Sequence, residues 1–290
     1  MTSPKLHRRA PRDPEGRMPL IEHVRELRGR LFKAFLGLLA GTIVGFIFFD
    51  QIWAVLKQPY CQLSIAHRLP GPQCDLVVHT IFEAFFLQLR VAVIIGVVIS
   101  SPVWLSQIWG FVTPGLRKNE KRWALAFVGT ATPLFLGGAA LAYLMLNKGL
   151  RILLSFTPTG VIPLIGVTHY LKYATLMVLV FGVSFELPLL VVMLNLVGIL
   201  SHEQLAKHRR AILFGVFVFA AVATPSQDPV TMLALSVPMV VLFELAELVA
   251  FLNDRRRARR EAEAPYAQLS DDETSEFGLE DTYDLEDEDR

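Results

Sequence analysis

The sequence predicts an all-α membrane protein with six transmembrane helices and both termini in the cytoplasm. Its 290 residues are 53% hydrophobic, with a mean hydropathy of +0.44. The apolar residues gather into separate runs, most of them long enough to cross a bilayer core of about 30 Å as a helix. No run has the strict alternation of a membrane β-barrel strand. The predicted helices are residues 31–49, 88–111, 123–146, 175–198, 211–223 and 231–250.

The distribution of basic residues predicts the orientation. Residues 1–33 carry nine Lys or Arg, and the connections after the second, fourth and sixth predicted helices carry twelve more. The alternate connections carry few. Cytoplasmic loops hold an excess of Lys and Arg, so both termini are expected on that side. The net charge of +1 hides this segregation and gives no indication of nucleic-acid binding.

Composition divides the chain into a membrane domain, residues 18–252, between two tails expected to be disordered. Residues 1–17 are basic, and residues 253–290 are first basic and then acidic. No secretory signal peptide is expected, because Arg8-Arg9 is followed by Ala-Pro-Arg-Asp and no apolar run begins before Leu31.

An amphipathic segment, residues 18–33, precedes the first predicted span. Its apolar residues recur at helical spacing with charges between them, which predicts an interfacial helix that continues into the span. Glu26 stands four residues before Arg30, so the two can pair on one helix face. The apolar positions are Leu20, Ile21, Val24, Leu27 and Leu31.

The two external connections differ in character. Residues 50–80 contain three prolines, including Pro59, and are expected to be irregular at their centre, with residues 81–87 extending the next helix outward. Residues 148–169 are unusually apolar but are interrupted by Pro158, Gly160 and Pro163. We expect a short helix and a folded cap there.

The only two cysteines, Cys61 and Cys74, fall in the first external connection. An oxidising compartment permits a disulfide there, which would close a loop of about 14 residues and contribute about 3 kcal/mol. The alternative is two free thiols without a role.

The last two predicted helices are unusual. Residues 211–223 form a run of about 20 Å as a helix, and residues 231–250 contain Pro238, Glu244 and Glu247. Local thinning of the bilayer would accommodate both. The turn between them contains Asp228. We expect a concave bundle with these two short helices at one side.

Glu186 lies near the middle of the fourth predicted span. A carboxylate at that depth costs about 2.5–3.5 kcal/mol on insertion scales, so it normally faces a cavity or a partner. One interpretation is the titrating group of a proton-coupled solute transporter. The other is a docking acceptor on a concave, partly wet face, close to Pro188, which frees the Ser184 carbonyl from its usual helical bond.

The sequence lacks the motifs of nucleotide-binding, metal-binding and catalytic sites. The sequence has no phosphate-binding loop and no His-Glu-x-x-His motif, and its histidines do not cluster with other metal ligands. Ser184 and Glu186 are two residues apart and do not face each other on a helix. We therefore expect no enzyme activity, no metal and no cofactor.

Two further carboxylates lie among basic residues. Glu26 has Arg30 within reach, and Glu120 stands in the segment FVTPGLRKNEKR, residues 111–122. One interpretation is that each carboxylate does no more than form a local ion pair, which contributes about 0–1 kcal/mol if it is exposed. On this evidence alone neither residue indicates a function.

Four segments, in the same order along the chain, resemble segments of one protein family and include these residues. MPLIEHVRELRGRL at 18–31 resembles the amino-terminal signature of the TatC family, the multispanning receptor of the twin-arginine protein translocase. SPVWLSQIWGFVTPGLRKNEKR at 101–122 resembles its first cytoplasmic loop, and FGVSFELPLL at 181–190 its fourth helix. ATPSQDPVTMLALSVPMVVLFE at 223–244 is similar to its last hairpin. The resemblance spans residues 18–250.

This resemblance implies a receptor in the bacterial cytoplasmic membrane. Such proteins bind signal peptides that carry paired arginines, self-associate, and assemble with single-span TatA/TatB partners to export folded proteins with the proton-motive force. It implies that Glu26 and Glu120 bind the arginine pair, since a guanidinium pairs with a carboxylate in a bidentate manner. Phe111, Leu27 and Arg28 are expected to support this binding of the signal peptide. Pro59 matches a family proline, whereas the two cysteines depart from the family pattern.

Overall fold

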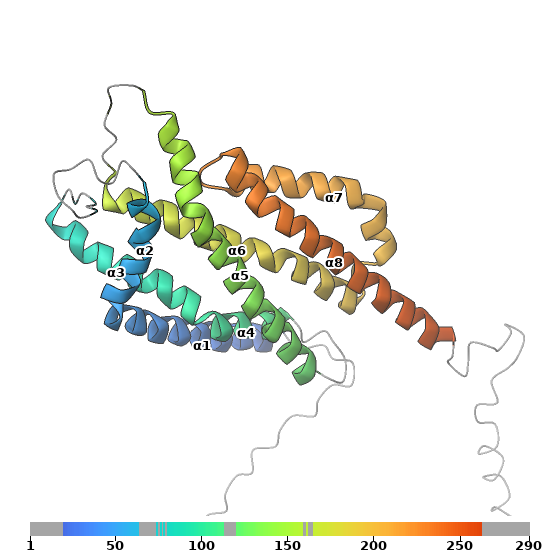
Figure 1. Cartoon of the computed structure of the whole chain (residues 1–290). Coiled ribbons are helices and arrows are strands. Elements are labelled where there is room, and N and C mark those ends of the chain that lie inside the picture. Colours follow the sequence, from blue (N-terminus) through green and yellow to red (C-terminus); the bar gives the residue numbers. More distant parts are fainter. Residues whose placement is uncertain are drawn as a thin grey trace, which may run out of the picture.

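The structure is a computed structural model that describes residues 20–63, 74, 76, 78, 80–112, 120–158, 161 and 165–262. Eight helices make up nearly all of this part, which confirms the all-α fold class (Figure 1). The side chains of residues 20–23, 112, 120–124 and 261–262 are not described. The helices are α1 Leu20–Ile47, α2 Phe49–Cys61, α3 Ile81–Ile99, α4 Ser101–Val112, α5 Glu120–Ser155, α6 Val167–Val197, α7 His202–Ala223 and α8 Pro229–Ala262.

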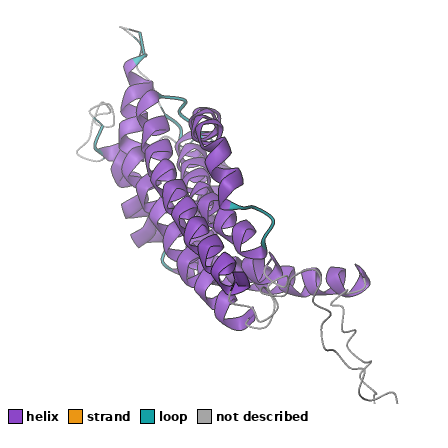
Figure 2. Ribbon diagram, turned by 90° about the vertical axis from the view of Figure 1, so that its right-hand side faces the viewer, coloured by secondary structure: helices purple, strands orange, loops and turns teal. Residues whose placement is uncertain are grey.

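The long helices lie side by side in a bundle (Figures 1 and 2). At one end, here called the basic end, α1 begins, α4 meets α5, α6 meets α7, and α8 ends. The opposite end carries the Cys61–Cys74 bond and is called the disulfide end. The main core lies between α5, α6 and α8, where Phe181, Leu146, Met177 and Leu235 are fully buried.

Five helices within the described residues are long and apolar enough to cross a membrane. These candidate spans are Val24–Ile47, Ile81–Ile99, Leu125–Ser155, Val167–Val197 and Pro229–Arg260. The fifth predicted span, residues 211–223, is the second half of α7, whose first half carries Lys207, Arg209 and Arg210. The count of six spans and the orientation therefore stay predictions.

Small residues bring α1 and α3 into close contact. A Cβ atom added to Gly41 would lie 2.7 Å from the Gly96 carbonyl oxygen, and one added to Gly45 would lie 2.7 Å from that of Ala92. The spacing of four residues on both helices is the small-xxx-small pattern by which membrane helices approach backbone to backbone. A larger side chain at either glycine would force the helices apart.

The predicted helix 88–111 is two helices, α3 and α4, separated at Ser100. Pro102 has no amide hydrogen to donate, which interrupts the helical hydrogen bonds at this point. The Trp104 indole donates to the carbonyl of Val97, next to the Val98 carbonyl that Pro102 cannot serve, at 2.9 Å. Beyond the break, α4 makes its own contacts with α1 and α5.

Most of the first external connection that the structure describes is helical, because α2 follows α1 directly. Pro59 lies inside α2 and cannot donate to the Val55 carbonyl, which instead accepts from the Tyr143 hydroxyl at 2.9 Å. The Pro59 carbonyl accepts from Asn147 Nδ2 at 2.7 Å. Two α5 side chains thus fasten α2 to the bundle. The remainder of the connection's centre lies outside the described residues.

The second connection is shorter than expected, since α5 continues to Ser155 and α6 begins at Val167. Residues 159–160 and 162–164 of its expected cap lie outside the described residues. The tail predicted from residue 253 was also wrong in part, because α8 continues to Ala262. Asn253 and Asp254 are tied to α6 and α7, and arginine is a good helix former that favours the last turn.

The Cys61–Cys74 disulfide joins the end of α2 to the segment that precedes α3. Around it Tyr60, Leu63, Leu150 and Tyr170 form a small core at the disulfide end, against which Leu76 packs. The bond therefore holds the outer part of the first connection onto α5 and α6.

We predict that Cys61→Ser lowers the free energy of unfolding by about 3 kcal/mol, the value expected for releasing a loop of this length. Thermal unfolding of the detergent-solubilised protein measures this. Cys74→Ser and the double variant should have the same effect, and a reductant should change only the unsubstituted protein. An unchanged midpoint in reductant would contradict the stabilising role.

Candidate functional site

Glu26 is held at the basic end by an arginine of its own helix. Arg30 donates to Glu26 Oε1 from Nε at 2.9 Å and from an Nη atom at 2.7 Å. The two residues are one helical turn apart, which brings their side chains together on one face of α1. Both side chains are about 30% exposed, so the pair is open to solvent and to ligands.

The same arginine brings Glu26 next to α4. A Cβ atom added to Gly110 would lie 2.3 Å from an Arg30 Nη atom, so the guanidinium lies directly against the Gly110 backbone. Any larger residue at position 110 would displace it. Phe111 follows and is half-buried, whereas Leu27 and Arg28 are exposed on α1. The structure therefore brings Glu26 close to the end of α4.

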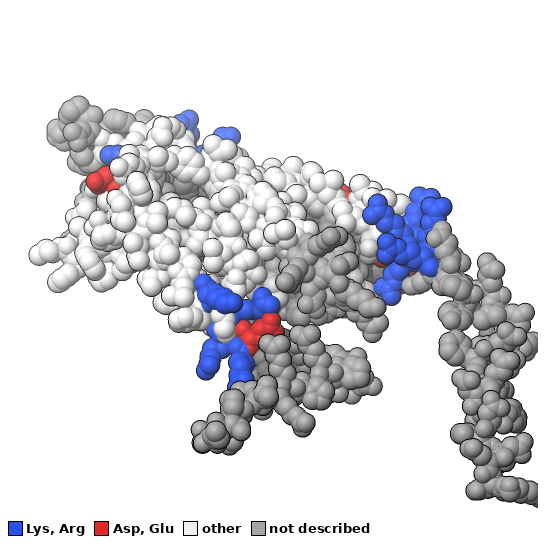
Figure 3. Space-filling model, turned by 90° about the horizontal axis from the view of Figure 1, so that it is seen from below, with Lys and Arg blue, Asp and Glu red and all other residues white. Residues whose placement is uncertain are grey.

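Glu120 is the first residue of α5, at the same end. Its side chain and the residues between α4 and α5 lie outside the described part, so the Glu26–Glu120 separation is not defined. Figure 3 shows two separate basic clusters, one around the start of α1 with acidic surface inside it and one where α8 ends. The first comprises Arg25, Arg28, Arg30 and Lys33 around Glu26.

Glu186 lies inside the bundle and has one described hydrogen-bond donor. Trp109 Nε1 of α4 lies 3.3 Å from Glu186 Oε2, while Glu186 Oε1 is buried without a partner among the described groups. The Trp109 ring, 5% exposed, stacks on Phe127 of α5 with centroids 5.3 Å apart. One indole thus joins α4, α5 and α6 at the depth of the intramembrane carboxylate.

Pro188 is buried on α6 beside a groove that reaches α7 and α8. This groove measures about 290 Å³ and is lined by apolar side chains. Leu187 and Pro188 stand on one wall, and Val216, Phe219 and Met239 complete it. Glu186 does not line this groove: its carboxylate meets Trp109 of α4, whereas Leu187 and Pro188 face α7 and α8.

Asp228 is a helix cap at the disulfide end. Its Oδ1 accepts from the backbone amides of Val230 at 3.0 Å and Thr231 at 2.9 Å, and its Oδ2 accepts from the Thr231 hydroxyl. Burial would raise the pKa of Asp228, but hydrogen bonds from Ser226, Thr231 and the two amides outweigh it and hold the pKa below 3.8. The carboxylate therefore fixes the α7–α8 turn.

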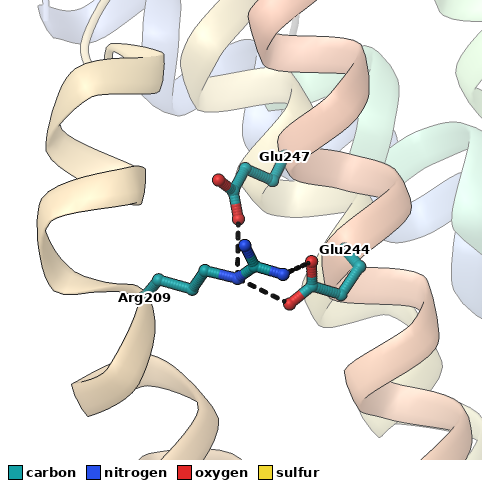
Figure 4. Close-up of polar contacts among 3 residues, drawn as sticks. All are labelled: Arg209, Glu244 and Glu247. Carbon is teal, nitrogen blue, oxygen red and sulfur yellow. Dashed lines mark hydrogen bonds and ion pairs between the residues drawn. The ribbon is translucent and has the colours of Figure 1, made fainter.

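Sequence reasoning missed an ion-pair cluster between α7 and α8. Arg209 binds Glu244 through Nε at 2.9 Å and through an Nη atom, and its Nε lies 3.7 Å from Glu247 Oε2 (Figure 4). Glu244 and Glu247 are three residues apart and share a helix face. That spacing, with an arginine on the preceding helix, was the available signal, since charges near membrane depth are normally paired.

The described residues offer no other chemistry. No group of three His, Cys, Asp or Glu side chains in this part of the chain could hold a metal ion. Ser184 donates to the Val180 carbonyl at 2.5 Å and does not meet Glu186. The arrangement can bind cationic and apolar groups, through Glu26 and through the grooves.

Comparison with known proteins decides the family. The model of the family "Sec-independent protein translocase protein (TatC)" matches residues 22–238. The chain belongs to the TatC family. It is 50% identical over 272 residues to the TatC protein of Frankia casuarinae, covering 92% of this chain and 75% of that one. With the TatC protein of Corynebacterium kroppenstedtii it shares 40% over 291 residues, or 93% and 70% of the two chains.

A solved structure agrees with this assignment. A crystal structure of the twin-arginine translocase receptor TatC superposes with a TM-score of 0.63 at 29% identity, covering 79% of this chain and 99% of that one. The TatC resemblance predicted from the sequence is confirmed. With five apolar helices long enough to span a bilayer, the chain is a multi-pass membrane protein of a translocase family, which is not a known class of enzymes.

We predict that the Asp228 cap makes the free energy of unfolding decrease at acidic pH. Because its pKa is lower in the folded than in the unfolded chain, its contribution is complete above about pH 4 and is lost as the pH falls through the folded pKa. Unfolding midpoints between pH 7 and pH 3 measure this. Asp228→Asn should be less stable at pH 7 and lose less on acidification, with Asp50→Asn as the control. Parallel curves for Asp228→Asn and the unsubstituted protein would contradict the cap.

Proposed function

We propose that this chain is the receptor of a twin-arginine translocation system in the bacterial cytoplasmic membrane, with the basic end in the cytoplasm. It binds the paired arginines of signal peptides through Glu26 and Glu120. It then assembles with single-span TatA/TatB-type proteins, and with further copies of itself, for export of folded proteins driven by the proton-motive force. Membership of the TatC family and the likeness to a crystallised twin-arginine translocase receptor support this proposal.

The observation that carries the proposal is the state of Glu26. Its carboxylate already accepts two hydrogen bonds from a guanidinium, and both end on Oε1. Within the described residues Oε2 accepts no hydrogen bond, so it can accept from a second guanidinium supplied by a ligand. The Glu26–Arg30 pair is partly exposed, and such pairs contribute only about 0–1 kcal/mol, so a ligand can rearrange it at small cost.

Two carboxylates suit a ligand with two arginines. Glu26 lies near the start of α1 and Glu120 begins α5, and the sequence between α4 and α5 also supplies basic residues. Arg25, Arg28 and Lys33 around Glu26 repel cations in general. A ligand must therefore form well-oriented bidentate pairs to bind, which favours arginine over lysine.

We predict that Glu26→Ala and Glu120→Ala each abolish export of a twin-arginine reporter in a strain without its own TatC protein, while Sec-dependent secretion stays normal. The reason is the loss of a guanidinium acceptor. Export assays with immunoblots for protein level measure this. Glu203→Ala, an exposed acidic residue at the start of α7, is the matched control and should export normally. Unimpaired export in the Glu26/Glu120 double variant would refute the assignment.

The Glu186 site is proposed to receive a polar group from a partner helix. Its Oε1 is buried without a partner among the described groups. A single-span helix with one polar side chain would supply that partner. An unsatisfied carboxylate oxygen in a membrane is costly, so docking there gains a hydrogen bond.

We predict that Glu186→Gln retains more export than Glu186→Ala, because glutamine can still accept from Trp109 and hydrogen-bond to a partner. Reporter export and co-purification of the single-span partners measure this. Trp109→Phe, which keeps the ring and removes the donor, should fall between the two. Equal and complete loss in the Gln and Ala variants would instead favour a proton-carrying role for Glu186, as in a proton-coupled transporter.

A further inference from the structure

A second groove, separate from Glu26 and from the groove beside Pro188, runs between α5, α6 and α8 toward the basic end. It measures about 450 Å³. Phe127 and Thr130 of α5, Leu189 and Val192 of α6, and Leu252 and Arg256 of α8 line it. Neither the receptor site nor the Glu186 site uses this groove.

The groove has a polar and an apolar end. Arg256 lies at the basic end of α8, and Val249 lies two turns, or about 10 Å, further into the bundle on the same helix. Between them the walls are apolar, and Val249 and Leu252 are each more than 40% exposed. The groove is therefore a long apolar surface with the positively charged Arg256 side chain at its basic end.

The other polar lining groups are already bonded within the protein. Thr130 Oγ1 donates to the Ala126 carbonyl at 2.9 Å, and Asn253 Nδ2 donates to Asn195 Oδ1 at 3.0 Å. The nearby Asp254 accepts from Asn195 and from the His202 amide. Within residues 125–158 and 165–260, no acidic side chain forms an ion pair with the exposed Arg256. Its charge is available to an anion.

The back of the groove is rigid. Phe127 is 4% exposed and stacks on Trp109, and Leu189 belongs to the same small core. An α-helix with side chains is about 10–12 Å across with a pitch of about 5.4 Å, so the groove holds little more than one turn of a partner helix. A hydrocarbon chain is thinner and fits such a space along its length.

We propose that this groove binds one anionic phospholipid, with Arg256 contacting the phosphate and the apolar walls holding an acyl chain. The cationic mouth favours an anion and disfavours an arginine-bearing signal peptide. Basic pockets between membrane helices on the side of the anionic leaflet are suited to lipid headgroups. The bound chain packs over Phe127 and so supports the Trp109 ring that donates to Glu186.

The test compares lipids with the same acyl chains on the purified full-length protein in detergent. Dioleoyl phosphatidylglycerol should raise the thermal unfolding midpoint, whereas dioleoyl phosphatidylcholine and inorganic phosphate should not. Arg256→Gln should weaken the phosphatidylglycerol response roughly fivefold, the factor that corresponds to about 1 kcal/mol per basic residue. Arg255→Gln, an exposed neighbour that does not line the groove, is the matched control and should respond as the unsubstituted protein does.

A second variant tests the acyl chain separately. Ala126→Trp fills the groove from an exposed wall position while Arg256 is kept, and it should abolish the phosphatidylglycerol response. Equal responses of Arg256→Gln and Arg255→Gln, or of the two lipids, would overturn the proposal. So would an unresponsive unsubstituted protein, or a full response to inorganic phosphate alone. None of these outcomes bears on twin-arginine export, which the reporter assay measures.

Discussion

The break between α3 and α4 is the constraint on which both proposed binding sites, at Glu26 and at Glu186, depend. Because Pro102 cannot donate a helical hydrogen bond, α3 ends at Ile99 and α4 begins at Ser101, and Trp104 donates to the Val97 carbonyl at the break. Helix α4 then presents Trp109 to Phe127 and Glu186, and Gly110 to Arg30. Consecutive residues of one short helix thus contact the intramembrane carboxylate and the arginine that holds Glu26.

A common rule explains the remaining polar contacts. Inside a bilayer each polar group needs a partner from the protein, and this chain supplies them mostly from neighbouring helices. The Tyr143 hydroxyl donates to the Val55 carbonyl, which Pro59 cannot reach, and Asp254 accepts from the His202 amide at the start of α7. Arg209 donates to Glu244. Glu186 Oε1 is one of several described buried side-chain atoms without a hydrogen-bond partner, and a partner helix is proposed to meet it.

The sequence predicted the fold class and the family because both depend on long, repeated signals. Apolar runs and charge segregation extend over many residues, and four family segments lie in order along residues 18–244. Glu26–Arg30 was foreseeable from their spacing on one helix. The Trp109–Glu186 contact joins residues 77 positions apart and depends on how α4 packs against α6, which no local pattern reveals. The α3–α4 break was signalled only by the Ser100-Ser101-Pro102 segment inside the predicted helix 88–111. The continuation of α8 to Ala262 depends on contacts of Asn253 and Asp254 with other helices.

The proposal that Glu26 of α1 and Glu120 of α5 receive the arginine pair, with support from Phe111 of α4, can be tested directly by photocross-linking. A photoreactive residue placed next to the arginines of a twin-arginine signal peptide would be activated with the protein in membranes, and the labelled segments identified by mass spectrometry. We expect labelling around Glu26 of α1 and Phe111 of α4, lost when both peptide arginines are replaced by lysine. Labelling confined to the disulfide end, or unchanged labelling with the lysine peptide, would contradict the proposal.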